Sequence, residues 1–140
     1  MPRFFTQPDD APALLSPRQA REYLQGGAVL LDIREPPETN YRVFDVPSVV
    51  FVPHSRFQER HGEIPHDVPL IVADAVGIRA KEIARFLRES GFPDVAWMAG
   101  GIVEWVRAGL PVRRDLNYEL RGQCGCKLRP RNPKEAPHQR

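Results

Sequence analysis

The chain alternates short apolar runs with longer segments in which apolar and polar positions share a helical period. Unbroken apolar runs of four to six residues are typical of strands buried on both faces, and such strands belong to parallel sheets. Four runs fit this description, and we predict strands at residues 28–33, 49–52, 70–73 and 95–98.

The segments between these runs predict helices. Ser16 followed by Pro17 is typical of a helix start, with serine as the N-cap and proline at the first helical position, and Gly26-Gly27 ends that helix. Residues 79–90 place apolar side chains on one stripe, which favours an amphipathic helix. We also predict a loop at residues 34–38, a single helical turn at 55–60 and a last helix at 102–108.

Strands that alternate with helices predict an α/β fold, a parallel sheet with helices on both faces. With 140 residues the chain is long enough for one such domain. We expect an irregular lead-in at residues 1–13, the folded domain at 14–112 and a tail at 113–140, where the apolar pattern fades.

Composition and charge limit the classes of function that this protein can have. Hydrophobic residues make up 41% and charged residues 27%, as in globular proteins. The net charge of +2 is divided unevenly: residues 1–112 carry 12 basic and 15 acidic side chains, and residues 113–140 carry 8 and 3. The basic tail suits an anionic partner, but its charges are not interleaved with a series of aromatics, which disfavours nucleic acid. The apolar runs are too short for a membrane span, and we expect a cytoplasmic protein.

The candidate site follows the third predicted strand. In an open parallel sheet the site lies at the carboxyl ends of the strands. There the short loop Asp74-Ala75-Val76-Gly77 opens directly onto a helix that begins near Arg79. Such a loop directs several backbone N–H groups at one point, and the helix dipole adds positive potential. The pattern predicts a cradle for an anion.

Asp74 has two readings from the residues alone. It is either a cap for the helix that follows, as aspartate commonly is, or a nucleophile in its own right. Enzymes with an aspartyl nucleophile typically place a second acid two residues later to bind magnesium, and here that position holds Val76. The cap is the favoured interpretation.

Over about residues 14–112 the sequence resembles the rhodanese family of single-domain sulfurtransferases. The resemblance rests on the order and spacing of several motifs: Asp32-Ile33-Arg34-Glu35 after the first strand, the strand-loop-helix at 70–87, Gly91-Phe92, and Gly100-Gly101-Ile102 through Trp105 to Gly109-Leu110-Pro111. It implies a five-stranded parallel sheet flanked by helices. It also implies an active-site loop at Asp74, Ala75, Val76, Gly77, Ile78 and Arg79, with Asp32, Arg34 and Glu35 as its supports.

The resemblance breaks down at the decisive residue. Active members of the family carry a cysteine that takes sulfane sulfur from a donor, holds it as a persulfide and passes it to an acceptor. Three residues before Gly77 that position holds Asp74, and Ala80 replaces a serine common in the family. A carboxylate oxygen cannot be persulfurated, so we expect the carboxylate to fill the cradle itself and the family's transfer reaction to be absent.

The two cysteines of the chain, Cys124 and Cys126, both lie in the tail. Glycine between them allows a strained, easily reduced ring disulfide, and neighbouring basic residues favour thiolate. Three interpretations stay open: thiols without a role, a redox or sulfur-accepting dithiol, or half of a metal site completed by another chain.

Two functions follow from the sequence. The first is a rhodanese-like binding or regulatory module in sulfur or redox metabolism, without sulfurtransferase activity. The alternative is a sulfur carrier or thiol-redox protein that works through Cys124 and Cys126. Neither implies a cofactor or a resident metal, and the expected partner is a protein or a small anion.

Overall fold

The structure is a computed structural model that describes residue 5 and residues 11–114, 122–124 and 127–128. It divides into two compact units. The first unit is Met1–Glu35 with Asp45–Pro111, and the second is Pro36–Phe44 with Val112–Arg140. The structure therefore groups residues 36–44 with the tail, whereas the sequence analysis placed them in the folded domain.

The first unit is built on a five-stranded parallel sheet, which confirms the predicted α/β fold. The strand order is β1-β6-β5-β2-β4, and every pairing is parallel. The register sets Asp32 beside Ala73, so β2 and β5 end at the same level. The strands are β1 (Ala13–Leu15), β2 (Val29–Asp32), β4 (Val49–Phe51), β5 (Leu70–Ala73) and β6 (Val95–Met98).

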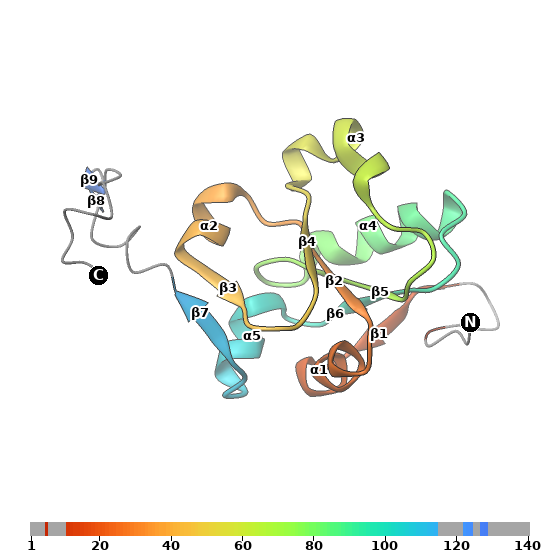
Figure 1. The fold of residues 1–140 in the computed structure, drawn as a ribbon, viewed down its shortest axis with the longest axis horizontal. Helices are drawn as coiled ribbons and strands as arrows, with labels where there is room; N and C mark the ends of the chain where they lie inside the picture. The colour runs from red at the N-terminus through yellow and green to blue at the C-terminus, as the bar shows by residue number, and fades with distance from the viewer. Residues whose placement is uncertain (1–4, 6–10, 115–121, 125–126, 129–140) are drawn as a thin grey trace. The chain divides into compact units, whose positions relative to one another are not determined.

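Helices cover both faces of this sheet. In Figure 1, α3 and α4 lie on one side and α1 and α5 on the other. The helices are α1 (Pro17–Gln25), α3 (Phe57–Arg60), α4 (Ile78–Glu89) and α5 (Gly101–Arg107), and the short 3-10 turns η1 (His54–Arg56) and η2 (His61–Glu63) flank α3. The predicted turn at 55–60 is thus a longer series of three short helical segments.

Local sequence signals explain where α1 begins. The Ser16 side chain accepts a hydrogen bond from the backbone N–H of Gln19, and the Gln19 side chain accepts one from the backbone N–H of Ser16. This reciprocal pair is a capping box, which satisfies two helix-end donors at once, with Pro17 at the first helical position.

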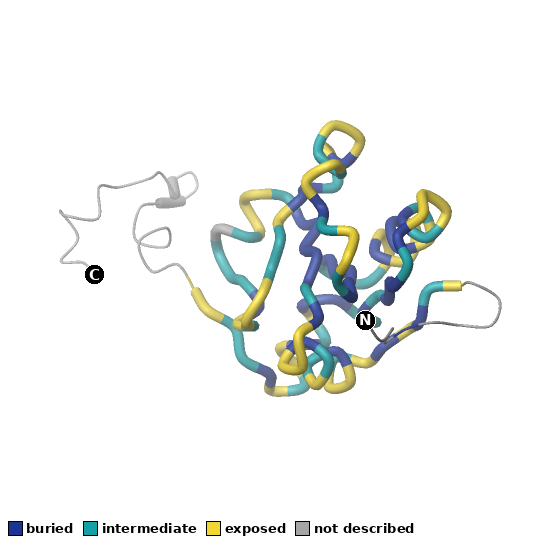
Figure 2. The backbone as a smooth tube through the Cα atoms, turned by 45° about the vertical axis from the view of Figure 1, so that its right-hand side comes forward, coloured by how far each residue is buried: buried dark blue, intermediate teal, exposed yellow. Residues whose placement is uncertain are grey.

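The core of the first unit lies on both sides of the central strands, which Figure 2 shows as buried. On the side of α3 and α4 a cluster of buried apolar side chains packs together, and it includes Leu31, Val72, Ile83 and Leu87. Because β2 and β5 are covered on both faces, nearly all their side chains are buried and the polar ones lie at their ends.

The second unit contains elements that the sequence did not predict. Its described elements are α2 (Pro36–Tyr41), β3 (Arg42–Phe44), β7 (Val112–Arg114), β8 (Gly122–Cys124) and β9 (Lys127–Leu128). The predicted loop at 34–38 is wrong from Pro36 onward, because prolines at the first positions of a helix cost no hydrogen bond and Pro36-Pro37 start α2. β3 pairs with β7 and β8 with β9, both antiparallel.

Within the described residues, none of the helices combines the length and the apolar character that crossing a membrane requires.

Candidate functional site

The candidate site lies at the carboxyl ends of the two central strands. The backbone N–H of Ile33 donates to the carbonyl of Ala73 at 3.0 Å, so the chain leaves β2 and β5 side by side. Asp74 is the first residue after β5, and the connection to α4 takes only the four residues 74–77. The short connection holds the Asp74 side chain at the amino end of α4.

The loop after β5 is a cradle of backbone N–H groups with the Asp74 carboxylate inside it. One carboxylate oxygen accepts from the backbone N–H of Gly77 at 2.6 Å, and the other accepts from that of Arg79 at 2.8 Å. The Asp74 residue is only 6% exposed. The carboxylate thus satisfies two donors at the start of a twelve-residue helix, where the dipole favours negative charge.

The Gly100-Gly101 turn at the start of α5 packs against the backbone of the Asp74 loop. The first N–H groups of α5 donate to the loop's carbonyls, Ile102 to Asp74 at 3.0 Å and Val103 to Ala75 at 3.2 Å. A Cβ on Gly101 would lie 2.3 Å from the Asp74 carbonyl oxygen, so only glycine permits this approach. The sequence analysis missed this role, although the Gly100-Gly101 pair before a helix was its signal.

Asp32 and Arg34 form a buried ion pair at the end of β2. The guanidinium Nη2 of Arg34 lies 2.8 Å from a carboxylate oxygen of Asp32, and the other oxygen accepts from the Nε and the backbone N–H of Arg34. Asp32 is fully buried. The pair braces the turn that follows β2, next to the strand that carries Asp74.

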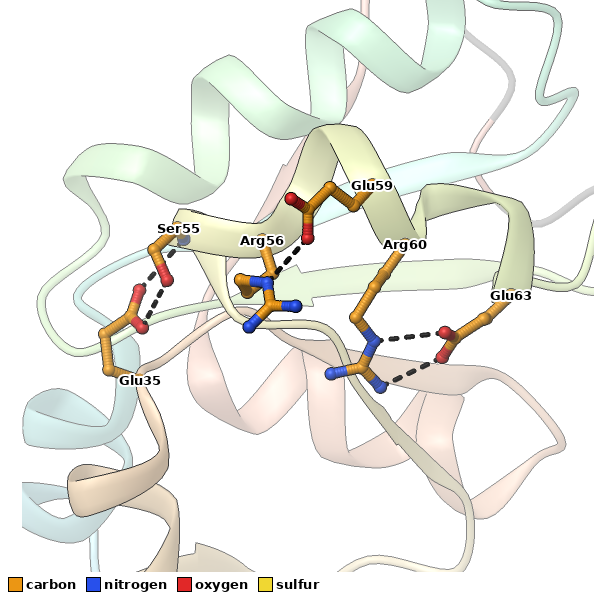
Figure 3. Close-up of polar contacts among 6 residues, drawn as sticks. All are labelled: Glu35, Ser55, Arg56, Glu59, Arg60 and Glu63. Carbon is orange, nitrogen blue, oxygen red and sulfur yellow. Dashed lines mark hydrogen bonds and ion pairs between the residues drawn. The ribbon is translucent and has the colours of Figure 1, made fainter.

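Glu35 joins this turn to the segment after β4. Its two carboxylate oxygens accept from the backbone N–H of Ser55 at 3.0 Å and from the Ser55 hydroxyl at 2.8 Å (Figure 3). These bonds hold the pKa of Glu35 below its ordinary value of 4.5, the hydroxyl contributing most, and the charges of His54 and Arg79 lower it further. The sequence analysis missed Ser55, whose signal was its position just beyond a strand end.

The rim of the cradle is apolar and exposed. Val76 in the loop is 51% exposed, Ile78 at the start of α4 is 72% exposed, and Val103 on α5 is 45% exposed.

The tail cysteines lie partly outside the described residues. Cys124 ends β8, where its register partner is Lys127 in β9. Cys126 lies outside the described residues. Across the part of the chain that the structure describes, no group of three or more His, Cys, Asp or Glu side chains is arranged to hold a metal ion.

Comparison with known proteins agrees with this fold. The family model of the rhodanese-like domain matches residues 16–108. The chain therefore belongs to the rhodanese-like sulfurtransferase family. It is 35% identical over 100 residues to a thiosulfate sulfurtransferase GlpE of Haemophilus influenzae, a match that covers 70% of this chain and 91% of that protein.

Two solved structures share the fold. A rhodanese-related protein from Thermoplasma volcanium is 25% identical, with a TM-score of 0.65 over 72% of this chain and 97% of that one. A polysulfide-sulfur transferase homodimer from Wolinella succinogenes is 26% identical, with a TM-score of 0.65 over 75% of this chain and 80% of that one.

Proposed function

We propose that Asp74 stands at the position of the family's cysteine, and that this chain is a binding or regulatory module of sulfur or redox metabolism that does not transfer sulfur from thiosulfate. The observation that carries the proposal is the pair of hydrogen bonds from Gly77 and Arg79 to the Asp74 carboxylate. The N–H groups that would stabilise an anionic sulfur already have a partner from the chain itself.

The chemistry of the side chain supports the same conclusion. Sulfane sulfur transfer needs a thiolate that attacks the donor and carries the sulfur as a persulfide. The carboxylate of Asp74 cannot form one, and residues 1–123 contain no cysteine. Relatives named for sulfur transfer supply the fold and the family, while this residue differs from what their chemistry needs.

What the domain retains is a rigid loop with an exposed rim. Asp74, buried and doubly hydrogen-bonded, fixes the backbone that displays Val76 and Ile78. A loop of constant shape with apolar side chains suits recognition of a protein partner better than it suits turnover.

The test is sulfur transfer from thiosulfate to cyanide by the full chain. The expected result is no turnover above the buffer rate, and the GlpE relative serves as the positive control. Substantial turnover that survives the double substitution Cys124→Ser/Cys126→Ser would contradict the proposal, because no other thiol exists in the chain.

A second candidate function is a sulfur-accepting or redox dithiol at Cys124 and Cys126. The observation in its favour lies in the sequence, where Arg121, Lys127 and Arg129 flank the two cysteines. Basic residues close to a cysteine favour its thiolate form. The same assay separates the two candidates, because any transfer through the tail disappears when both cysteines are replaced by serine.

A further inference from the structure

The β3–β7 ribbon of the second unit gathers arginines around one tyrosine. In its register Arg42 lies directly opposite Arg114, and Arg113 lies opposite Val43. Tyr41, the last residue of α2, immediately precedes β3. We call Arg42, Arg114 and Tyr41 the arginine–tyrosine cluster.

The cross-strand pair is unfavourable by itself. Like charges directly opposite each other on a ribbon repel. Neither guanidinium can lose its proton to relieve the repulsion, because arginine stays charged in proteins. The pair therefore places two fixed positive charges at one position of the ribbon.

Tyr41 holds both guanidinium groups on one platform. The central carbon of the Arg42 guanidinium lies 5.5 Å from the centroid of the Tyr41 ring, and that of Arg114 lies 5.2 Å from it. The Arg114 Nη2 also donates to the Tyr41 hydroxyl at 2.6 Å. The ring attracts both cations and restricts their rotamers, so their N–H groups are arranged before a ligand arrives.

Arg42 has a donor without an acceptor. Its Nε is buried and has no hydrogen-bond partner, the one such side-chain atom among the described residues. Arg56, Arg60 and Arg107 of the first unit each pair with a glutamate on the same helical turn or the next. Within the described part of the chain Arg42 has no such carboxylate. A buried N–H of a charged group normally has a partner.

The whole second unit carries a positive net charge, as this cluster does. By sequence, Pro36–Phe44 and Val112–Arg140 carry nine basic and four acidic residues, a balance of +5, while the first unit carries eleven and fourteen, a balance of −3. Seven of the nine basic residues are arginine. Arginine is favoured over lysine where oxyanions are bound through paired N–H groups.

We propose that the arginine–tyrosine cluster binds a phosphate-type oxyanion. A carboxylate matches a single guanidinium fork, whereas the oxygens of a tetrahedral phosphate or phosphodiester point in different directions and can accept hydrogen bonds from two guanidinium groups at once. Arg42 and Arg114, held to one ring, supply two such groups, and the Nε of Arg42 gains an acceptor. The cluster shares no residue with the Asp74 loop, so this proposal can be tested independently of the function proposed above.

The first experiment titrates inorganic phosphate into the full chain at low ionic strength and follows, by NMR, the arginine Nε–H resonances and the backbone amide resonances of residues 41–44 and 112–114, which every variant retains. The expected result is a saturable shift of the Arg42 and Arg114 signals, with a dissociation constant in the millimolar range or tighter. Affinity falls at least tenfold in Arg42→Gln and in Arg114→Gln. Shifts that rise linearly without saturation would overturn the proposal for free phosphate.

Two controls separate a site from general charge. The double variant Arg56→Gln/Arg107→Gln removes two exposed cations of the first unit, and phosphate affinity should stay within a factor of two. The double variant Arg42→Lys/Arg114→Lys keeps the charge but not the guanidinium forks, and affinity should still fall several-fold. Equal losses in the first control and in the cluster variants would overturn the proposal. The lysine variant also keeps the test valid if the glutamine variants fold poorly.

A second arm identifies the source of the phosphate. The same titration is repeated with a short single-stranded oligonucleotide, whose phosphodiesters carry the same chemistry. A saturable shift of the amides of residues 41–44 and 112–114 with the oligonucleotide alone, weakened in the lysine variant, would assign the site to a phosphodiester chain. Absence of a saturable shift with both ligands overturns the proposal.

Discussion

At the scale of single residues, the carboxylate of Asp74 does in this chain what a bound anion would do for the loop. Its two oxygens accept from Gly77 and Arg79, so two donors at the start of α4 are satisfied without solvent. Hydrogen bonds to a charged group contribute about 1.5–3 kcal/mol each. Asp74 is therefore a stabilising residue whatever further role the loop has.

Restoring a thiol at this position should reveal how far the cradle keeps its anion-stabilising geometry. In Asp74→Cys, made with Cys124 and Cys126 replaced by serine, the N–H groups of Gly77 and Arg79 should lower the thiol pKa from about 8.5 to below about 7.5. Attack of this thiolate on the outer sulfur of thiosulfate should then release sulfite and leave a persulfide, which mass spectrometry detects as one added sulfur.

The matched control is Arg85→Cys in the same serine background, since Arg85 is exposed on the middle of α4. Its thiol should titrate near the ordinary value and acquire no sulfur. If the two variants behave alike, the loop gives no special stabilisation to an anion.

Glu35 should make stability depend on pH. Its folded-state pKa is below 4.5 because Ser55 donates two hydrogen bonds to it. A depressed carboxyl pKa contributes stability that is present above about pH 4.5 and is lost as pH falls through the folded-state pKa. The pair is partly exposed, so we expect a contribution on the order of 0.5 kcal/mol.

The measurement is urea unfolding of the wild type and of Glu35→Gln at pH 7 and near pH 3. The difference in unfolding free energy should be largest at pH 7 and shrink at low pH. In a Ser55→Ala background the same comparison should give a smaller difference at pH 7. If the wild type and Glu35→Gln differ by the same unfolding free energy at pH 7 and near pH 3, Ser55 does not set the protonation of Glu35.

At the scale of elements, the site depends on two turns that approach each other closely. Gly101 has φ +58° and contacts the backbone of Asp74 and Ala75, while Gly77 has φ +94° and lies against Gly100. The N–H groups that open α5 are satisfied by carbonyls of the loop before α4. The amino ends of both helices therefore depend on the same four loop residues.

Gly101→Ala should disrupt this contact. An added Cβ meets backbone atoms at 2.3–2.5 Å and also forces alanine into a left-handed conformation. The left-handed conformation costs about 1–2 kcal/mol and overpacking about 1–3 kcal/mol more, so we expect a loss of about 3 kcal/mol or more. Chemical denaturation measures it.

Gly109→Ala is the matched control, because Gly109 has φ +80° but no atom near the added Cβ. It should lose only the conformational part, about 1–2 kcal/mol. Gly62→Ala, which has neither a positive φ nor a close neighbour, should be nearly neutral. Equal effects at Gly101 and Gly109 would show that the close approach carries no energy.

Features with a local sequence signal could be predicted from the sequence, whereas features that depend on contacts between distant segments could not. Strands β2, β4, β5 and β6 were predicted because burial on both faces leaves a continuous apolar run, and α1 and α4 because their caps and stripes are local signals. The Asp74 loop could be singled out as a candidate because its residues are contiguous in the sequence. The missed strands β1, β3 and β7 lie in apolar runs of at most three residues, whereas the equally short β4 lies in the four-residue apolar run 49–52. Ser55 and Gly101 were missed because their roles are contacts across distant segments.

At the scale of the whole molecule, charge is divided between two units that also differ in composition. The first unit is mildly acidic and holds the parallel sheet, and the second is basic and holds both cysteines. Since the buried apolar cluster lies entirely in the first unit, its stability should not depend on the redox state of the tail.

The oxidised and reduced proteins should therefore melt at the same temperature. A Cys124–Cys126 disulfide closes a minimal loop, which removes little chain entropy, and its ring strain makes it easy to reduce. Melting curves before and after reduction, with a glutathione titration followed by mass, check both statements. A shift of many degrees on reduction would mean that the tail is a structural staple.

The Asp74 carboxylate differs from a free anion in that its occupancy of the loop does not depend on a ligand concentration. A ligand that diffuses in and out of a loop is present in proportion to its concentration, but a ligand that belongs to the chain has a local concentration set by covalent geometry. Dilution, dialysis or a competing anion at ordinary concentration does not remove it. The surface that Val76 and Ile78 present is then the same in sulfur-rich and sulfur-starved conditions. A partner that recognises this loop would respond to the concentration of the protein and not to the supply of sulfur.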